Sequence, residues 1–174
     1  SEFATSFWAA ALLKDRVGST AAISTVAIVA LGTGMGIGRW YGGLVLKNLP
    51  LDNQLLTIIA LQFVGFLGFW LSHNMVISLL CLLIVGLGIS MQFALSSIRL
   101  IGLSDGRPDL AIGRSSLAAG IAIGGAPFLL GVLGDSFGIS RAYLMVPVLI
   151  LIAVAIVIAV PAHMSREDLD RLEA

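Results

Sequence analysis

Five long apolar runs set the strongest limit on what this chain can fold into. An α-helix needs ~20 mostly apolar residues to cross a bilayer, and each run approaches or meets that length. The runs show no sustained alternation of polar and apolar residues, so they predict helices and not membrane strands. The predicted full spans are residues 21–46, 55–71, 75–98, 115–133 and 143–160, and residues 1–13 are predicted to be part of a sixth.

The composition agrees with an all-α, polytopic helical membrane bundle. Charged residues make up 11% of the 174 residues and hydrophobic residues 58%, whereas a soluble domain has about 25% charged residues. The net charge of zero gives no indication of a nucleic-acid partner. We expect a membrane domain over residues 1–163 and a polar tail over 164–174. Because the chain opens without a methionine or a basic leader, we also expect an N-terminally truncated fragment.

The basic residues predict the orientation of the bundle. If the spans alternate in direction, seven basic residues fall on one side of the membrane and three on the other. Basic residues accumulate in cytoplasmic loops, so the side with seven is predicted to be cytoplasmic, together with the C-terminus. The seven are Arg39, Lys47, Arg99, Arg107, Arg114, Arg166 and Arg171, and the three are Lys14, Arg16 and Arg141.

Two glycine-rich strips predict close packing between helices. In the first, small residues four apart let another helix approach backbone to backbone. Its arginine is predicted to bond the terminal carbonyls of a neighbouring helix and act as a latch, although it could be a plain interfacial anchor. The second strip contains a proline expected to kink its helix, and we expect the two strips to face each other. The first comprises Gly34, Gly38, Arg39, Gly42 and Gly43; the second comprises Gly120, Gly124, Gly125, Pro127 and Gly131.

Three stretches together resemble the C-terminal six-helix half of a major facilitator superfamily transporter. They are Gly38-Arg39-x2-Gly42-Gly43, Gly124-Gly125-x-Pro127-x3-Gly131-x3-Asp135-x2-Gly138-x2-Arg141-Ala142, and Glu2-Phe3-x3-Phe7-Trp8. The first is similar to the loop after the eighth helix of that fold, the second to the eleventh helix and its turn, and the third to the seventh helix. The fuller loop motif also has an acidic residue and more basic ones, of which only Arg39 and Lys47 occur here.

The resemblance implies transport of a small solute by alternating access, between this bundle and a missing N-terminal six-helix half. It implies a permease of the bacterial inner membrane, with the lipid bilayer, the missing half and the solute as partners and with proton coupling left open. A non-transporting membrane subunit that needs a partner protein, docking at residues 99–114, is the alternative.

Four residues are candidates for contact with a solute or proton. A carboxylate within a span marks such a site by default, which makes Glu2 the first candidate, unless it lies near the outer interface. Trp8 could stack on a ligand, but an interfacial belt position is favoured. In the resembling fold Gln92 would lie on the cavity wall, while an interhelical hydrogen bond is expected for Gln62. Ser96 shares the face of Gln92, although its hydroxyl can bond its own helix.

Enzymatic and metal-dependent functions are not indicated. His73 and His163 lie far apart, in connectors on opposite predicted sides, so no metal site is expected. No nucleophile, base and orienting acid can be assembled from the polar residues. We therefore expect neither an enzyme nor a bound cofactor.

Overall fold

Every regular element in the described part of the chain, residues 21–104 and 107–161 of a computed structural model, is a helix. The all-α prediction is therefore confirmed for these residues. The helices are α2 (Ala21–Leu46), α3 (Leu51–Leu71), α4 (Met75–Ile89), α5 (Gln92–Gly102), α6 (Pro108–Phe137), α7 (Ile139–Ala142) and α8 (Met145–Ala159).

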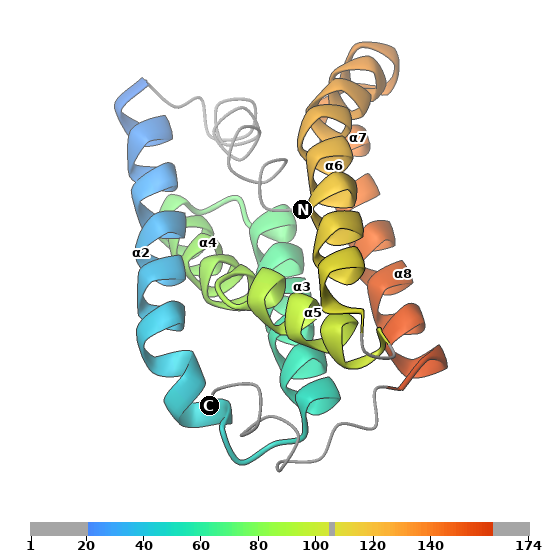
Figure 1. Ribbon diagram of the computed structural model, residues 1–174. Coiled ribbons are helices and arrows are strands. Elements are labelled where there is room, and N and C mark those ends of the chain that lie inside the picture. The colour runs from blue at the N-terminus through green and yellow to red at the C-terminus, as the bar shows by residue number, and fades with distance from the viewer. Residues whose placement is uncertain (1–20, 105–106, 162–174) are drawn as a thin grey trace.

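The long helices run up and down in alternation (Figure 1). α2 runs downward, α3 returns, α4 and α5 run downward in succession, and α6 and α8 complete the series. The α2–α3 and α5–α6 connectors and the end of α8 therefore share the lower end of the molecule. The connectors α3–α4 and α6–α8 share the upper end, as the sequence predicts.

Three helical segments of the described chain are long and apolar enough to cross a membrane. They are Leu51–Leu71, Met75–Gly102, which joins α4 and α5, and Pro108–Phe137; α8 is apolar but shorter. Large apolar side chains such as Val64 and Ile121 are exposed on the bundle. An apolar surface this extensive is typical of one that faces lipid or a partner. The five full crossings expected from the sequence stay a prediction.

Several helix boundaries differ from those predicted. α3 begins at Leu51 and not at residue 55, because Pro50 precedes the helix without interrupting it. α6 extends beyond 115–133 at both ends, so the predicted connector 99–114 is largely helical. Pro108 opens α6, where its missing N–H costs nothing, and Gly138, with a φ of 83°, ends it. α6 continues through Pro127.

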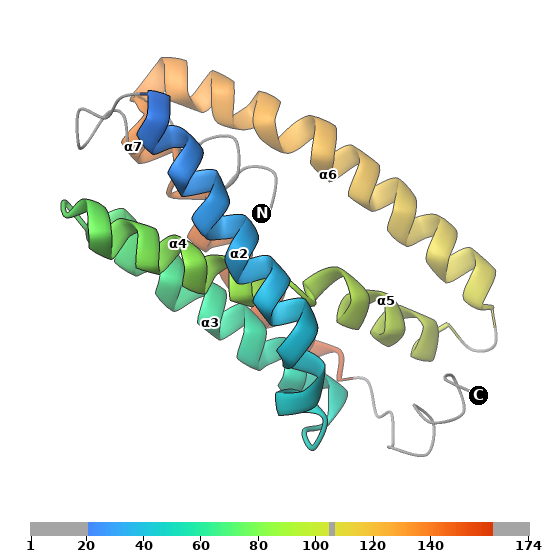
Figure 2. The same ribbon diagram turned by 90° about the vertical axis from the view of Figure 1, so that its left-hand side faces the viewer.

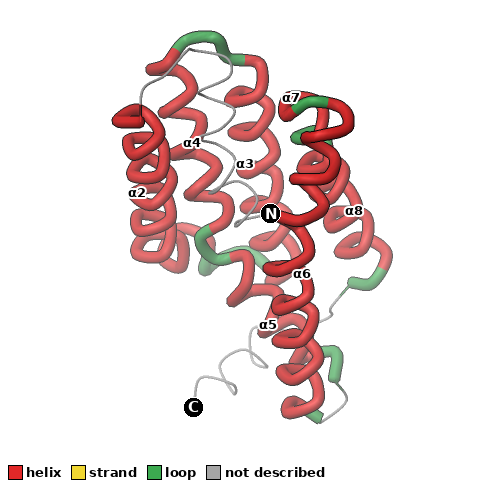
Figure 3. Tube along the Cα trace, turned by 90° about the horizontal axis from the view of Figure 1, so that it is seen from above, coloured by secondary structure: helices red, strands yellow, loops and turns green. Residues whose placement is uncertain are grey.

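α4 is the central element of the main helix layer, between α2 and α3 (Figure 3). Its side chains Leu82 and Val85 are completely buried in the core. α8 packs against α3, and the ring of Phe66 stacks on that of Tyr143, with centroids 5.6 Å apart. This core fixes α3 and α4. The polar residues described below lie on α3, at the end of α4 and on the helices α2 and α5.

Asn74 caps α4. Its Oδ1 accepts hydrogen bonds from the backbone N–H groups of Val76 and Ile77, at 2.9 and 3.4 Å. Replacing Asn74 with alanine should lower the free energy of unfolding by about 1 kcal/mol, because the first turn loses its side-chain acceptor. Chemical denaturation in detergent measures the change. Asn74→Asp should retain most of the stability, and equal losses for both variants would contradict the capping role.

Candidate functional site at a helix break

The predicted span 75–98 is interrupted at Ser90 and Met91, where α4 ends and α5 begins (Figure 2). The Ser90 hydroxyl donates to the carbonyl of Leu87 at 2.6 Å. That carbonyl would otherwise accept from the N–H of Met91 one turn later, so the hydroxyl competes with the helix ladder. Helix breaks at membrane depth are tolerated where neighbouring groups satisfy the freed backbone.

Two glutamine side chains meet at this break. Gln92 opens α5, and its Nε2 donates to Oε1 of Gln62 at 2.7 Å. Gln62 lies near the middle of α3 and is 1% exposed. Its own Nε2 is buried without a hydrogen-bond partner in the described structure, and an orphaned donor of this kind costs about 1–3 kcal/mol. The interhelical bond expected for Gln62 is present, and its partner is the candidate Gln92.

Glycines bring the neighbouring helices close to the break from both sides. A Cβ atom added to Gly88 of α4 would lie 2.6 Å from the backbone nitrogen of Gln62. On the α2 side, a Cβ at Gly38 would lie 2.3 Å from the Ser90 hydroxyl oxygen, and one at Gly42 would lie 2.6 Å from the Met91 sulfur. Side chains at Gly88 and Gly38 would therefore push the break away from α3 or α2, whereas one at Gly42 would displace only the flexible Met91 side chain.

Arg39 bonds the end of α4. Its Nε donates to the carbonyl of Ser90, the C-cap residue of α4, at 3.4 Å. A cation at a helix C-terminus complements the helix dipole. The predicted bond to a terminal carbonyl of a neighbouring helix is therefore present. However, Arg39 lies inside α2, which continues to Leu46, and its action as a latch stays a prediction.

α2 and α4 cross at their glycines with almost no space between backbones. A Cβ at Gly34 would lie 2.1 Å from the carbonyl oxygen of Leu83, and one at Gly86 would lie 2.2 Å from that of Leu31. The first glycine strip therefore packs as small-xxx-small contacts do, with Gly34-x3-Gly38 against Gly86-x3-Ser90. Gly43 of the same strip lies farther out, since its Cβ would be 4.0 Å from the Met91 methyl.

The expectation that the two glycine strips face each other is wrong. No heavy atom lies within 4 Å of a Cβ placed on any of the four glycines of the second strip, as far as the described residues show. α4 fills the position beside α2, because it supplies its own small residues at the matching four-residue spacing. The four glycines of the second strip are Gly120, Gly124, Gly125 and Gly131.

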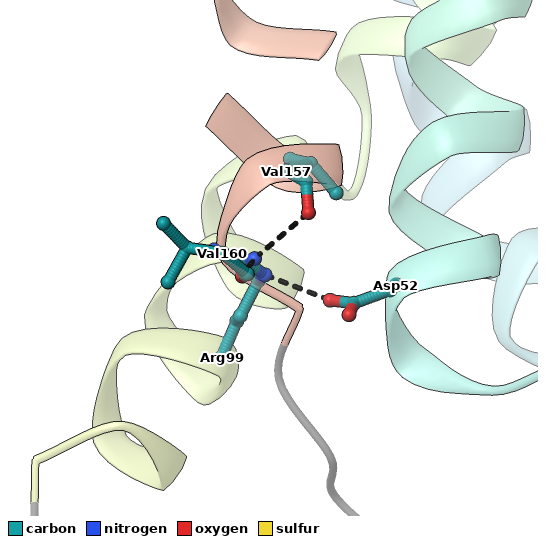
Figure 4. Close-up of polar contacts among 4 residues, drawn as sticks. All are labelled: Asp52, Arg99, Val157 and Val160. Atoms are coloured by element: carbon teal, nitrogen blue, oxygen red, sulfur yellow. Dashed lines mark hydrogen bonds and ion pairs between the residues drawn. The ribbon is translucent and has the colours of Figure 1, made fainter. Parts of the chain in front are cut away.

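A buried arginine, missed in the sequence, joins three helices (Figure 4). Nε of Arg99 donates to Oδ1 of Asp52 at 2.7 Å, and Nη2 donates to the carbonyls of Val157, at 3.2 Å, and Val160. The cation thus lies at the C-terminus of α8, and the carboxylate lies in the first turn of α3. Both charges complement the dipoles of those helices. We call these four residues the Arg99 clamp.

The sequence contained a signal for the Arg99 clamp. Asp52 lies near the start of one predicted span and Arg99 just after the end of the next, both on the predicted cytoplasmic side. Opposite charges at one end of antiparallel neighbours can pair. Counting Arg99 only as a connector charge concealed this pairing.

The remaining candidates do not join this site in the described structure. Ser96 is exposed on α5, one turn after Gln92, without a bond to it. Glu2 and Trp8 lie outside the described residues. Residues 21–104 and 107–161 also contain no group of three His, Cys, Asp or Glu side chains that could hold a metal ion.

Comparison with known proteins gives no relative: no family model, no curated protein and no solved structure matches the chain.

Proposed function

We propose that the chain is half of a membrane transporter that moves a small solute by alternating access. The observation that supports this most is the Gln62–Gln92 amide pair at the break between α4 and α5. In secondary transporters, discontinuous helices form the solute site near the midplane of the bilayer. Polar residues at that depth are expensive to bury and mark a site by default.

The resemblance to the major facilitator superfamily supports the finer parts of this proposal. On that basis the chain forms five full crossings and part of a sixth, and it works with an N-terminal six-helix half. The location would be the bacterial inner membrane, with the C-terminus in the cytoplasm, as the distribution of basic residues favours.

The chemistry of the break favours a neutral, polar solute. A glutamine amide offers both a hydrogen-bond donor and an acceptor but no charge. The Gln62 side chain fixes one end of the Gln92 amide, so Gln92 can present its remaining polar atom to a solute. Any proton coupling would then depend on a carboxylate elsewhere, for which Glu2 is the candidate.

Replacing Gln92 with leucine in the full-length protein tests this function. Membrane vesicles that contain the full-length protein should accumulate or release at least one solute relative to empty vesicles, measured by mass spectrometry. Gln92→Leu should lower that rate about tenfold or more, because a solute would lose a hydrogen bond and Gln62 its partner.

Phe93→Leu is the matched control, because Phe93 is the next residue and is 64% exposed on the apolar surface. It should transport at the rate of the unmodified protein. Vesicles that move no solute at all would contradict the proposal, and copurification of a partner ATPase would instead support the membrane-subunit alternative.

A further inference from the structure

α5 is attached to the bundle differently from α4. α4 buries Leu82, Val85 and Ile89 in the core and also meets α2 and α3 through its glycines. α5 buries only Leu95 and Arg99 along its 11 residues. The core therefore fixes α4, whereas α5 is held by Leu95, by packing against α3 and α6, and by polar contacts.

Those polar contacts lie at the two ends of α5 and both lead to α3. Gln92 at its start bonds Gln62, and Arg99 near its end pairs with Asp52. The two side chains are seven residues apart, which is two helical turns and places them on one face. One face of α5 is thus held along α3 by an amide pair and an ion pair, and Arg99 also reaches the end of α8.

The backbone between α4 and α5 is suited to bending. Ser90 and Met91 interrupt the helix, and the Ser90 hydroxyl already bonds the carbonyl that a continuous helix would use. Helix breaks with such side-chain insertions are the usual positions of sharp kinks. Glycines of α2 lie against Met91, and the nearest atoms to them are the sulfur and methyl of its flexible side chain.

The arrangement in which α5 lies against α3 leaves one buried polar group without a hydrogen bond. Nε2 of Gln62 is buried without a hydrogen-bond partner in the described structure. A buried unpaired donor raises the free energy of this arrangement. Movement of α5 away from α3 would let water reach both amides, so the cost of opening is partly offset at this end.

We propose that α5 is an arm that swings about Ser90 and Met91 while α4 stays fixed. The Arg99 clamp holds α5 against α3 and α8 in the closed position. This motion needs no transported solute, so it goes beyond the function proposed above and stands or falls separately from it.

Distances between paired spin labels in the full chain, in lipid nanodiscs, test the arm. The labelled positions are exposed: Val64 on α3, Leu80 on α4 and Leu100 on α5. Cys81→Ala first removes the native thiol, and cysteines are then introduced in the pairs Val64–Leu100 and Val64–Leu80. Asp52→Asn should increase the population of longer Val64–Leu100 distances about tenfold, because the Arg99 clamp loses its ion pair. The Val64–Leu80 distances should not change.

The Arg99→Gln variant and the double variant complete the cycle. Arg99→Gln should open the arm at least as much as Asp52→Asn, because it also removes the guanidinium from the carbonyls of Val157 and Val160. The double variant should open it little further than Arg99→Gln alone, because both changes remove the same ion pair. Unchanged Val64–Leu100 distances in all three variants would overturn the proposal. Equal broadening of both label pairs would also overturn it, since α4 would then move together with α5.

Discussion

Replacing Gly86 with leucine is expected to separate α2 from α4 and to unfold the helical bundle. Even the first side-chain atom would lie 2.2 Å from the carbonyl oxygen of Leu31 and 3.0 Å from the backbone nitrogen of Met35. Both are backbone atoms and cannot rotate away, so the helices must move apart and lose packing around them. Overpacking alone costs typically about 1–3 kcal/mol, and we expect a loss of about 3 kcal/mol or more here.

A pair of variants on α2 gives this prediction its control. A Cβ at Gly34 would lie 2.1 Å from the carbonyl oxygen of Leu83, whereas a Cβ at Gly36 would have no heavy atom of the described structure within 4 Å. Leucine has a higher helix propensity than glycine, so Gly36→Leu should not destabilise the helix itself. Thermal unfolding and size-exclusion profiles in detergent should show loss of the fold for Gly34→Leu and Gly86→Leu only. Similar behaviour of Gly34→Leu and Gly36→Leu would contradict the α2–α4 crossing.

Replacing Arg99 with leucine should be the second most damaging change. The variant leaves the Asp52 carboxylate without the Arg99 cation and removes the donor from the carbonyls of Val157 and Val160. Side-chain exposures of 10% for Arg99 and 18% for Asp52 mean that water screens the pair only in part. Removing one partner of a buried ion pair typically costs about 3–5 kcal/mol, and we expect a loss in that range.

Denaturation in detergent measures that loss, and Arg114→Leu is the matched control. Arg114 is an exposed arginine on α6, so its replacement should change the free energy of unfolding by less than about 0.5 kcal/mol. Limited proteolysis at the end of α8 should become faster in Arg99→Leu alone. Equal stability of the two leucine variants would show that the Arg99 clamp does not stabilise the fold.

The sequence predicts where the helices of this protein lie along the chain better than it predicts which helices pack against each other. The length of the apolar runs identifies α2, α3, α6 and α8, because the membrane-spanning requirement acts on each segment separately. The cap at Asn74 is equally local. The break at Ser90 is not predicted, because it contains neither proline nor a polar run and depends on a single hydroxyl.

Pairings between helices depend on the arrangement in space and were harder to predict. The glycine strip of α2 had two possible partners in the sequence, Gly86-x3-Ser90 on α4 and the longer strip on α6. The glycine-rich, proline-containing surface of α6 led us to pair it with α2, but the α4 residues occupy the position beside α2. The pair Arg99–Asp52 joins residues 47 positions apart, which no local pattern specifies.

Thiol labelling at Gln92 tests most directly whether the helix break lies on a solute pathway. The full-length protein, in native membranes and with Cys81→Ala, would carry either Gln92→Cys or Val64→Cys, the latter being 62% exposed on the apolar surface of α3. Only a thiol that reaches water forms the reactive thiolate. A charged, membrane-impermeant reagent should therefore modify Gln92→Cys and leave Val64→Cys intact. Gln92→Cys as unreactive as Val64→Cys would contradict the proposed solute site.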